Sequence, residues 1–232
     1  GQWLSADAMQ IEYRLFAHEA KNPTVLKAYE TDPLLSFHKL VWDEVKKLKP
    51  DISYKQQKNL NFAKLYGAGV IRIASMLDLI TAEDVETLRK EKATWAHPKL
   101  QSARHAMEIY ARVLPEVGQM LKRSTMASER LGYVTTILGR RARFTGKFYK
   151  ALNSRIQGSA ADIMKLKLIA LHQERTRTGF VMRCTVHDEV DGDAPDAACV
   201  GAVQDILNRQ AVPLRVPILW DVSTGPTWGQ CE

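Results

Sequence analysis

The chain has 232 residues, of which 45% are hydrophobic and 25% are charged, and its net charge is +7. This composition is typical of a folded protein with one large domain or two small ones, and it excludes a disordered chain. Short apolar runs argue against a membrane helix, and the opening residues lack the pattern of a secretory signal. Three cysteines without Cys-x-x-Cys spacing argue against a disulfide framework or a zinc site, so we expect a cytoplasmic protein with no membrane partner.

The first part of the chain predicts one strand followed by helices. Residues 2–6 predict a short strand that ends at Asp7, and the apolar spacing becomes helical from Gln10. Residues 34–48 predict an amphipathic helix. Ser53 is placed to cap the next helix, which runs to the "YGAG" stretch.

The middle of the chain predicts further helices and then a strand. Residues 82–95 predict a charged helix, and residues 97–131 predict a long helical stretch that bends at Pro115. The stretch "GYVTTIL" alternates and is rich in β-branched residues, so it predicts a strand. The following "GRRARFTGKF" predicts a basic loop.

The last part of the chain mixes helices with three more strands. Residues 151–178 and 196–210 predict helices, and "VPILWDV" predicts a final strand. Between the helices, "FVMRCTV" and "EVDGDA" predict two strands joined at His187 and Asp188. A few widely separated strands among long helices favour an α+β fold over a regular βαβ repeat.

Positive charge is concentrated in one segment. Residues 121–177 contain thirteen Lys or Arg and three acids, a net charge of +10, so the remainder of the chain sums to −3. Such a segment suggests a polyanionic partner. A solvated helix face is the alternative, and charge alone favours that alternative.

Two acids are candidates for a metal site. Asp7 ends a predicted strand and Asp188 lies at a predicted turn, and each alone is more typical of a structural role. Together on adjacent strands they would repel one another unless they shared cations, and magnesium binds carboxylate oxygens plus substrate phosphates. Two such ions, roughly 3.5–4 Å apart, stabilise an in-line displacement. About 180 residues separate the two acids, so the sequence does not show that they meet, and the neighbouring Asp191 and Asp193 are interpreted as polar strand residues only.

Two helix faces carry further candidates. Lys58, Phe62 and Tyr66 follow at spacings of four, so they share a face that would suit a triphosphate and a sugar or base. A core-facing aromatic stripe with a snorkelling lysine is the alternative, which the stripe alone favours. Asn153 and Gln157 are also four apart and would reach acceptors in a DNA minor groove, although either alone is ordinary surface polarity.

Five stretches in order resemble the successive motifs of family A DNA polymerases, the bacterial DNA polymerase I class. They are "SADAMQIEYRLFAH", "KQQKNLNFAKLYGAG", "GYVTTILGRRARF", "ALNSRIQGSAADIMK" and "VHDEV", and the tail "VPILWDVSTGPTWGQ" is also similar. The resemblance covers essentially the whole chain and is strongest to phage members. It implies a DNA-directed DNA polymerase of DNA replication, located in a bacterial host cytoplasm if it is phage-encoded.

The resemblance also implies an architecture. A palm made of a small antiparallel sheet backed by helices would span residues 1–30 and 146–232. A helical fingers subdomain would be inserted at residues 31–145, with the nucleotide-binding helix at 53–67. The family's thumb and 3′→5′ exonuclease are absent from these residues, so we expect them in an upstream polypeptide, in cis or in trans.

The resemblance further implies the roles of individual residues. Two Mg²⁺ ions would be held by Asp7, Asp188 and the backbone carbonyl of Ala8, with Lys58 completing the catalytic set. Glu12 would be the steric gate that selects deoxynucleotides. The incoming dNTP would contact Gln10, Glu12, Lys58, Phe62, Tyr66 and Gly67. The primer-template DNA would contact Arg140, Arg141, Asn153, Gln157, His187 and Glu189.

The sequence departs from the family pattern at two positions. Tyr54 and Tyr149 stand where many members carry an arginine. The adjacent Lys55 and Lys150 offer a point charge instead of a bidentate fork, which bears on triphosphate affinity.

Two other functions stay open at this point. One is a single-subunit RNA polymerase, against which Glu12 and Glu189 argue. The other is a catalytically incomplete DNA-binding fragment that needs an N-terminal partner chain.

Overall fold

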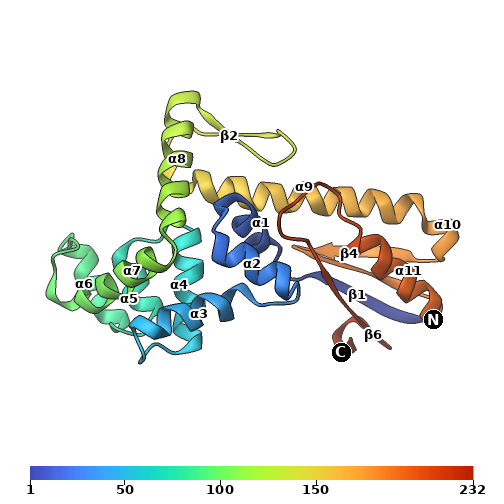
Figure 1. Cartoon of the computed structure of the whole chain (residues 1–232), viewed down its shortest axis with the longest axis horizontal. Coiled ribbons are helices and arrows are strands. Elements are labelled where there is room, and N and C mark those ends of the chain that lie inside the picture. The colour runs from blue at the N-terminus through green and yellow to red at the C-terminus, as the bar shows by residue number, and fades with distance from the viewer. Residues whose placement is uncertain (232) are drawn as a thin grey trace.

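The chain folds around a four-stranded antiparallel sheet, shown with its helices in Figure 1; the computed structural model describes residues 1–231. The strand order is β4-β5-β1-β6. The strands are β1 (Gln2–Ala8), β4 (Val181–Val186), β5 (Glu189–Ala194) and β6 (Trp220–Gly225). The first strand is therefore central and pairs with strands from the last quarter of the chain.

The two faces of this sheet differ, as the alternation of side chains along a strand requires. Leu4, Ala6 and Ala8 of β1 are buried on one face. Beside Leu4, Gly192 of β5 leaves room for Phe180, because a Cβ there would lie 2.7 Å from that ring. The other face carries Ser5 and the acids of β1 and β5, of which Asp7 is exposed and Asp191 is buried.

Helices cover the apolar face of the sheet and form its core. They are α1 (Ile11–Ala20), the long α9 (Ala151–Gln173), α10 (Arg175–Thr178) and α11 (Ala197–Asn208). Helix α9 packs against α1 and α11, and α11 also packs against β5 and β6. Figure 1 shows α9 running the length of the sheet and on toward the helical end of the molecule.

The remaining helices gather at the other end of the molecule (Figure 1). They are α2 (Pro23–Thr31), α3 (Phe37–Leu48), α4 (Tyr54–Leu65), α5 (Val70–Met76), α6 (Ala82–Lys90), α7 (Gln101–Val113) and α8 (Pro115–Leu131). Helix α8 projects from this group and leads into a hairpin of β2 (Tyr133–Thr135) and β3 (Arg141–Arg143). Short 3₁₀ turns are η1 (Pro98–Leu100), η2 (Phe148–Lys150) and η3 (Trp228–Gln230).

The α+β class is confirmed, and most elements lie where the sequence predicts them. The start of α4 is set by a capping box, in which the Ser53 hydroxyl accepts from Gln56 N–H and the Gln56 amide accepts from Ser53 N–H. Among residues 1–231, no helix combines the length and the hydropathy needed to span a bilayer.

Several boundaries differ from the sequence prediction, among them the helix predicted over residues 151–178, which is divided into α9 and α10 at Glu174, and the strand predicted from "GYVTTIL", which spans only Tyr133–Thr135. The charged helix ends at Lys90, and the stretch at Pro115 is a break between two helices instead of a bend, since proline opens α8 at its first position. The predicted basic loop contains β3, because its backbone pairs with β2. The last strand begins at Trp220, since Ile218 N–H donates to the Gln210 side chain before the ladder starts.

Candidate active site

The fold brings Asp7 and Asp188 to the same edge of the sheet. Asp7 is next to last in β1, and Asp188 lies in the turn that joins β4 to β5. In the β1–β5 pairing Asp7 is opposite Glu189, and Ala8 N–H donates to the Asp188 carbonyl at 3.0 Å. Two acids about 180 residues apart in sequence are therefore on neighbouring backbone segments.

The turn that carries Asp188 is tight. His187 has a φ of 57°, in the left-handed region that few non-glycine residues occupy. Its Nδ1 lies 2.8 Å from Asp188 Oδ1, and this contact is the main cause that raises the pKa of His187. A short turn with a side-chain contact fixes where the Asp188 carboxylate points.

Negative charge crowds around Asp7. Burial first, then the carboxylates of Asp188, Glu189 and Asp221, raise the pKa of Asp7 to about 6. Asp221 of β6 is directly opposite Asp7, and among residues 1–231 Asp7 has no Lys or Arg within salt-bridge distance. Such a group of carboxylates is suited to cations.

The donor set at this sheet edge consists of two carboxylates, which could hold a divalent cation only together with other ligands. Within the described part of the chain, no group of three or more His, Cys, Asp or Glu residues converges as a metal cluster. Magnesium is usually bound by one or two carboxylates together with waters and substrate phosphates. The pair at the sheet edge therefore has the right donors for an ion that arrives with a phosphate.

Glu189 is tied to the polar face of the sheet. Its carboxylate accepts from the Ser5 hydroxyl at 2.6 Å and from Trp228 Nε1 at 2.9 Å, and the Ser5 bond is the main cause that lowers the pKa of Glu189. Asp191, next along this face, is fully buried, which the sequence interpretation as an ordinary polar strand residue missed. Burial and the nearby Glu189 raise the pKa of Asp191.

The second half of the site is the face of α4. Lys58 is exposed, and the rings of Phe62 and Tyr66 are stacked with centroids 6.3 Å apart. Gly67 follows with a φ of 66°, and a Cβ there would lie 3.3 Å from the Tyr149 carbonyl. The predicted stripe is therefore partly a core contact, because Phe62 also packs against Tyr13 and His38 with ring centroids 5.4 Å away, while Lys58 stays exposed.

Glu12 and Tyr66 link this helix to the sheet. Tyr66 Oη donates to Glu12 Oε2 at 2.7 Å, and Gln157 Nε2 lies 3.4 Å from Tyr66 Oη. The other oxygen, Glu12 Oε1, is 3.8 Å from His187 Nε2. Glu12 is only 7% exposed, and burial followed by the Glu12 bond raises the pKa of Tyr66 to about 12. The structure thus brings four of the predicted residues together from α1, α4, α9 and the β4–β5 turn.

Comparison with known proteins identifies the family. The sequence model of DNA polymerase family A matches residues 1–230. The chain belongs to DNA polymerase family A.

The relatives are longer than this family A chain. DNA polymerase DpoZ of Salmonella phage PMBT28 is 29% identical over 98% of this chain and 38% of that protein. DNA polymerase I of Deinococcus radiodurans is 30% identical over 97% of this chain and 23% of that protein. The chain therefore spans less than two fifths of the length of these relatives.

A solved structure has the same fold. The POL domain of Pol1 from M. smegmatis, in a complex with DNA primer-template and dNTP, matches with a TM-score of 0.80 and 24% identity. The match covers 98% of this chain and 40% of that one. The sheet backed by helices is thus the fold of a polymerase domain.

Other predicted residues of the family A chain lie away from the carboxylates. Arg140 and Arg141 lie at the β2–β3 hairpin, where Arg140 bonds Asp162 and the Gly158 carbonyl and Arg141 covers the Tyr133 ring at 4.6 Å. Asn153 is partly buried in α9. These contacts place the hairpin against α9.

The Gln10 side chain has a structural role in this family A chain. Its side chain bonds Ser36 Oγ at 3.0 Å and Phe37 N–H at 3.1 Å, so it fixes the start of α3. Its backbone is left-handed, with a φ of 50°. The amide that sequence reasoning assigned to the nucleotide is thus already engaged in this structure.

Sequence reasoning missed Arg14, which orders the backbone next to Asp7. Its guanidinium is 1% exposed and donates to the carbonyls of Met9, Pro33 and Pro217 at 2.7–2.8 Å. An arginine inside the apolar stretch "IEYRLFAH" was the available signal, because a buried charge needs several partners. The sequence holds no other sign of this role, because the carbonyls of Pro33 and Pro217 that accept from Arg14 are distant in sequence.

Proposed function

We propose that this chain carries the active site of a DNA-directed DNA polymerase, which transfers a dNMP from a dNTP to a primer 3′-OH during DNA replication. The observation that carries the proposal is the meeting of Asp7 and Asp188 at one sheet edge, beside Glu12 and the α4 face. Phosphoryl transfer requires a protein to position the reacting groups and to neutralise their charge. The α4 face would position the dNTP, and the carboxylate edge would hold the cations that neutralise charge.

The metal is proposed to be magnesium, as two ions. Family A polymerases generally use divalent metal ions. Asp7, Asp188 and the Ala8 carbonyl would hold them, in agreement with the raised pKa of Asp7 in the crowd of carboxylates. When bound, such ions lower the pKa of the attacking hydroxyl and neutralise the triphosphate.

The side chains of α4 are proposed to bind the dNTP. Lys58 is placed to neutralise the leaving pyrophosphate, because its ammonium is exposed on the side of the paired rings. Phe62 would pack beside the sugar, and Tyr66 with Gly67 would form the base of the pocket. Gln10 would contribute by fixing the neighbouring start of α3.

Glu12 is proposed to select deoxynucleotides. Its carboxylate is buried and accepts a hydrogen bond from Tyr66, so moving it away from a ribose 2′-OH would break that bond. Rejecting the hydroxyl in this way needs a rigid gate, and the hydrogen bond provides that rigidity.

The DNA partner is proposed to lie along α9 and the hairpin. Asn153 and Gln157 would contact the minor groove, and Arg140 and Arg141 the backbone, while His187 and Glu189 would lie near the primer end. The assignment of residues 1–30 and 146–232 to a palm and 31–145 to fingers is part of the same proposal. An upstream polypeptide, as in the longer relatives, is the proposed source of further DNA contacts.

Primer extension by the purified chain tests the proposal. A labelled primer annealed to a longer template is incubated with dNTPs and Mg²⁺, and products extended according to the template are expected. Asp188→Asn serves as the inactive control, and NTPs in place of dNTPs test the sugar preference. Template-independent products, or extension that is equal with NTPs, would contradict the proposal.

A further inference from the structure

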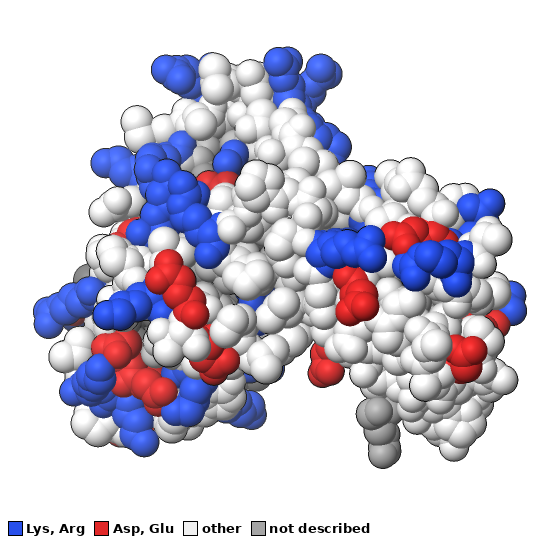
Figure 2. All heavy atoms as spheres, turned by 45° about the vertical axis from the view of Figure 1, so that its right-hand side comes forward, with Lys and Arg blue, Asp and Glu red and all other residues white. Residues whose placement is uncertain are grey.

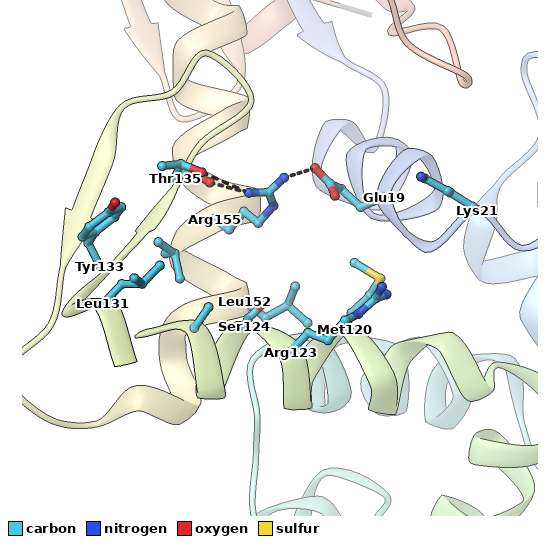
Figure 3. Close-up of a pocket in the computed structure, with 12 residues that line it drawn as sticks. Glu19, Lys21, Met120, Arg123, Ser124, Leu131, Tyr133, Thr135, Leu152 and Arg155 are labelled. Carbon is cyan, nitrogen blue, oxygen red and sulfur yellow. Dashed lines mark hydrogen bonds and ion pairs between the residues drawn. The ribbon is translucent and has the colours of Figure 1, made fainter. Parts of the chain in front are cut away.

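A cavity of about 490 Å³ lies behind the candidate active site, at the junction of four elements (Figure 3). It is bounded by the end of α1, by α8, by β2 and by the first turns of α9. Protein interiors and helix junctions are normally filled to the density of organic crystals, so an open space of this size calls for an explanation. Its volume is in the range of small-ligand sites.

The cavity is on the opposite side of α9 from the polymerase site. Leu152 and Arg155 line it, whereas Gln157 reaches Tyr66. Residues 155 and 157 are about 200° apart around a helix, so their side chains point in opposite directions. The cavity is therefore a separate surface, although α1, α9 and the β2–β3 hairpin contribute residues both to it and to the site described above.

The floor of the cavity is apolar. Met120, Leu131, Val134 and Leu152 contribute side chains to it, and Met120, Val134 and Leu152 are buried. Tyr133 lines one wall, and its ring is held by the guanidinium of Arg141 at 4.6 Å. The floor and this wall would suit a flat, mostly apolar group such as a nucleobase.

The rim of the cavity is cationic. Arg155 spans one side, where it donates to the Thr135 carbonyl at 2.7 Å and to Glu19 Oε1 at 2.6 Å, as Figure 3 shows. The Arg155–Glu19 ion pair therefore adds no net charge to the rim. Lys21 and Arg123 also line the cavity, and in the described part of the chain neither has an acidic partner within salt-bridge distance. Two uncompensated cations next to an apolar floor favour an anionic ligand with an apolar part.

The surroundings indicate which anion this would be. Residues 121–150, which include α8 and the hairpin, contain eight Lys or Arg and one acid. Figure 2 shows Lys and Arg side chains at the edges of the upper part of the molecule, with few acids among them. A duplex would rest on such a surface and could not enter the cavity, whereas a nucleotide of a single strand can turn its base inward.

We propose that this cavity binds one nucleotide of the single-stranded template, with the base on the apolar floor beside Tyr133 and the phosphate near Lys21 and Arg123. The inference rests on the proposed polymerase function, which supplies the single strand. It adds a binding site that none of the active-site residues provides, and it places the unpaired template along α8 and the hairpin.

Binding of labelled DNA tests this proposal without any need for catalysis. Fluorescence anisotropy compares a blunt duplex with a primer-template that has a single-stranded 5′ overhang. The double variant Lys21→Gln/Arg123→Gln is expected to weaken binding of the overhang substrate on the order of tenfold and to reduce its salt dependence by about 1.4 in logarithmic slope. Binding of the blunt duplex is expected to stay the same.

Two more variants separate the cavity from the general charge. Ala127→Trp should fill the space without a change in charge, and the same selective loss for the overhang substrate is expected. Lys27→Gln/Lys90→Gln, at exposed positions on α2 and α6, removes the same charge elsewhere and should leave both affinities unchanged.

A photocrosslinking thymidine analogue in the overhang adds a measurement on the unaltered chain. Attachment to α8 or β2 is expected. Attachment only to α4 or α5, or equal loss for blunt and overhang DNA in the variants, would overturn the proposal while the polymerase function stood. Unchanged DNA binding in every variant would also overturn the proposal that the cavity binds the template. An acidic segment of a protein partner would then be the alternative ligand. A chain that bound neither DNA would contradict both proposals.

Discussion

The two halves of the candidate active site differ in how complete they are. The α4 half is packed: the rings of Phe62 and Tyr66 stack, and the Tyr66 hydroxyl already bonds Glu12. The sheet half is electrostatically unbalanced, since Asp7 faces three other carboxylates. The difference teaches that the proposed nucleotide surface is largely formed by packing within the protein, whereas the carboxylate edge carries negative charge that the proposed cations would balance. A substitution in one half can therefore show whether the other half depends on it.

The largest effect is expected from the carboxylate edge. Asp7→Asn and Asp188→Asn should each lower the rate of primer extension by at least about 10³-fold, because each removes charge that positions and neutralises the reacting groups. Single-turnover extension measures the loss, and a gel shift should show that DNA binding is kept. Asp193→Asn is the matched control, since Asp193 is on the same hairpin but pairs with Arg183. Extension at the parent rate by either site variant would show that the metal assignment is wrong.

A smaller loss is expected from the preformed half. Lys58→Ala should lower kcat by about 10²-fold, the usual effect of removing one group that stabilises developing charge. Steady-state kinetics with a saturating primer-template measures it. Lys90→Ala, an exposed lysine on α6, should have no effect. A change in KM for the dNTP alone, with kcat intact, would restrict Lys58 to ground-state binding.

The bond that joins the two halves is expected to affect both stability and selectivity. Tyr66→Phe leaves the buried Glu12 carboxylate without its donor, which should cost about 1–3 kcal/mol in free energy of unfolding. Urea denaturation gives that number. The freed gate should also admit more ribonucleotide, which the ratio of NTP to dNTP incorporation detects. Tyr54→Phe, at an exposed tyrosine, is the control, and equal effects of the two substitutions would argue against the gate.

The smallest expected effect is a pH-dependent change in stability at Asp7 in cation-free buffer. Below pH 3.8 the carboxyl is protonated in both the folded and the unfolded chain, so it costs no stability. Between pH 3.8 and about 6 the unfolded chain ionises Asp7 while the folded chain keeps it protonated, so stability is lost across this window and the loss is complete above about pH 6. Asp7→Asn should therefore raise the melting temperature well above pH 6 and not below pH 3.8.

Divalent cations should reverse this difference. With Mg²⁺ present, the ionised Asp7 gains a partner, so the parent chain should gain more in melting temperature than the Asp7→Asn variant. Equal gains for the two chains would mean that the ion binds elsewhere.

The features that could be predicted from sequence are the ones encoded locally. Ser53 and Gln56 specify the start of α4 within four residues, and the strands on either side of His187 and Asp188 form a hairpin. Within a helix, a spacing of four is enough to place Phe62 and Tyr66 on one face. The meeting of Asp7 with Asp188 was expected only through the family resemblance.

The features that could not be predicted depend on distant partners. The position of Asp221 opposite Asp7 depends on where β6 begins, and Asn208 and Gln210 of the preceding helix and loop help to fix that start. Arg14 is buried because carbonyls from three separate segments converge on it. No local pattern contains such information, because the residues that decide it are up to about 200 positions apart.

The central place of β1 has a consequence for biosynthesis. Its neighbours in the sheet are formed by residues 189–194 and 220–225, so its backbone hydrogen bonds must wait until almost the whole chain has left the ribosome. The helices between residues 23 and 131 make mainly short-range contacts and can form earlier. A nascent chain would then carry a folded helical part and an unpaired β1. Such an unpaired strand can be bound by chaperones, cleaved by proteases or drawn into aggregates. The carboxylates of Asp7 and Asp188 can come together only once β1 has paired with β5.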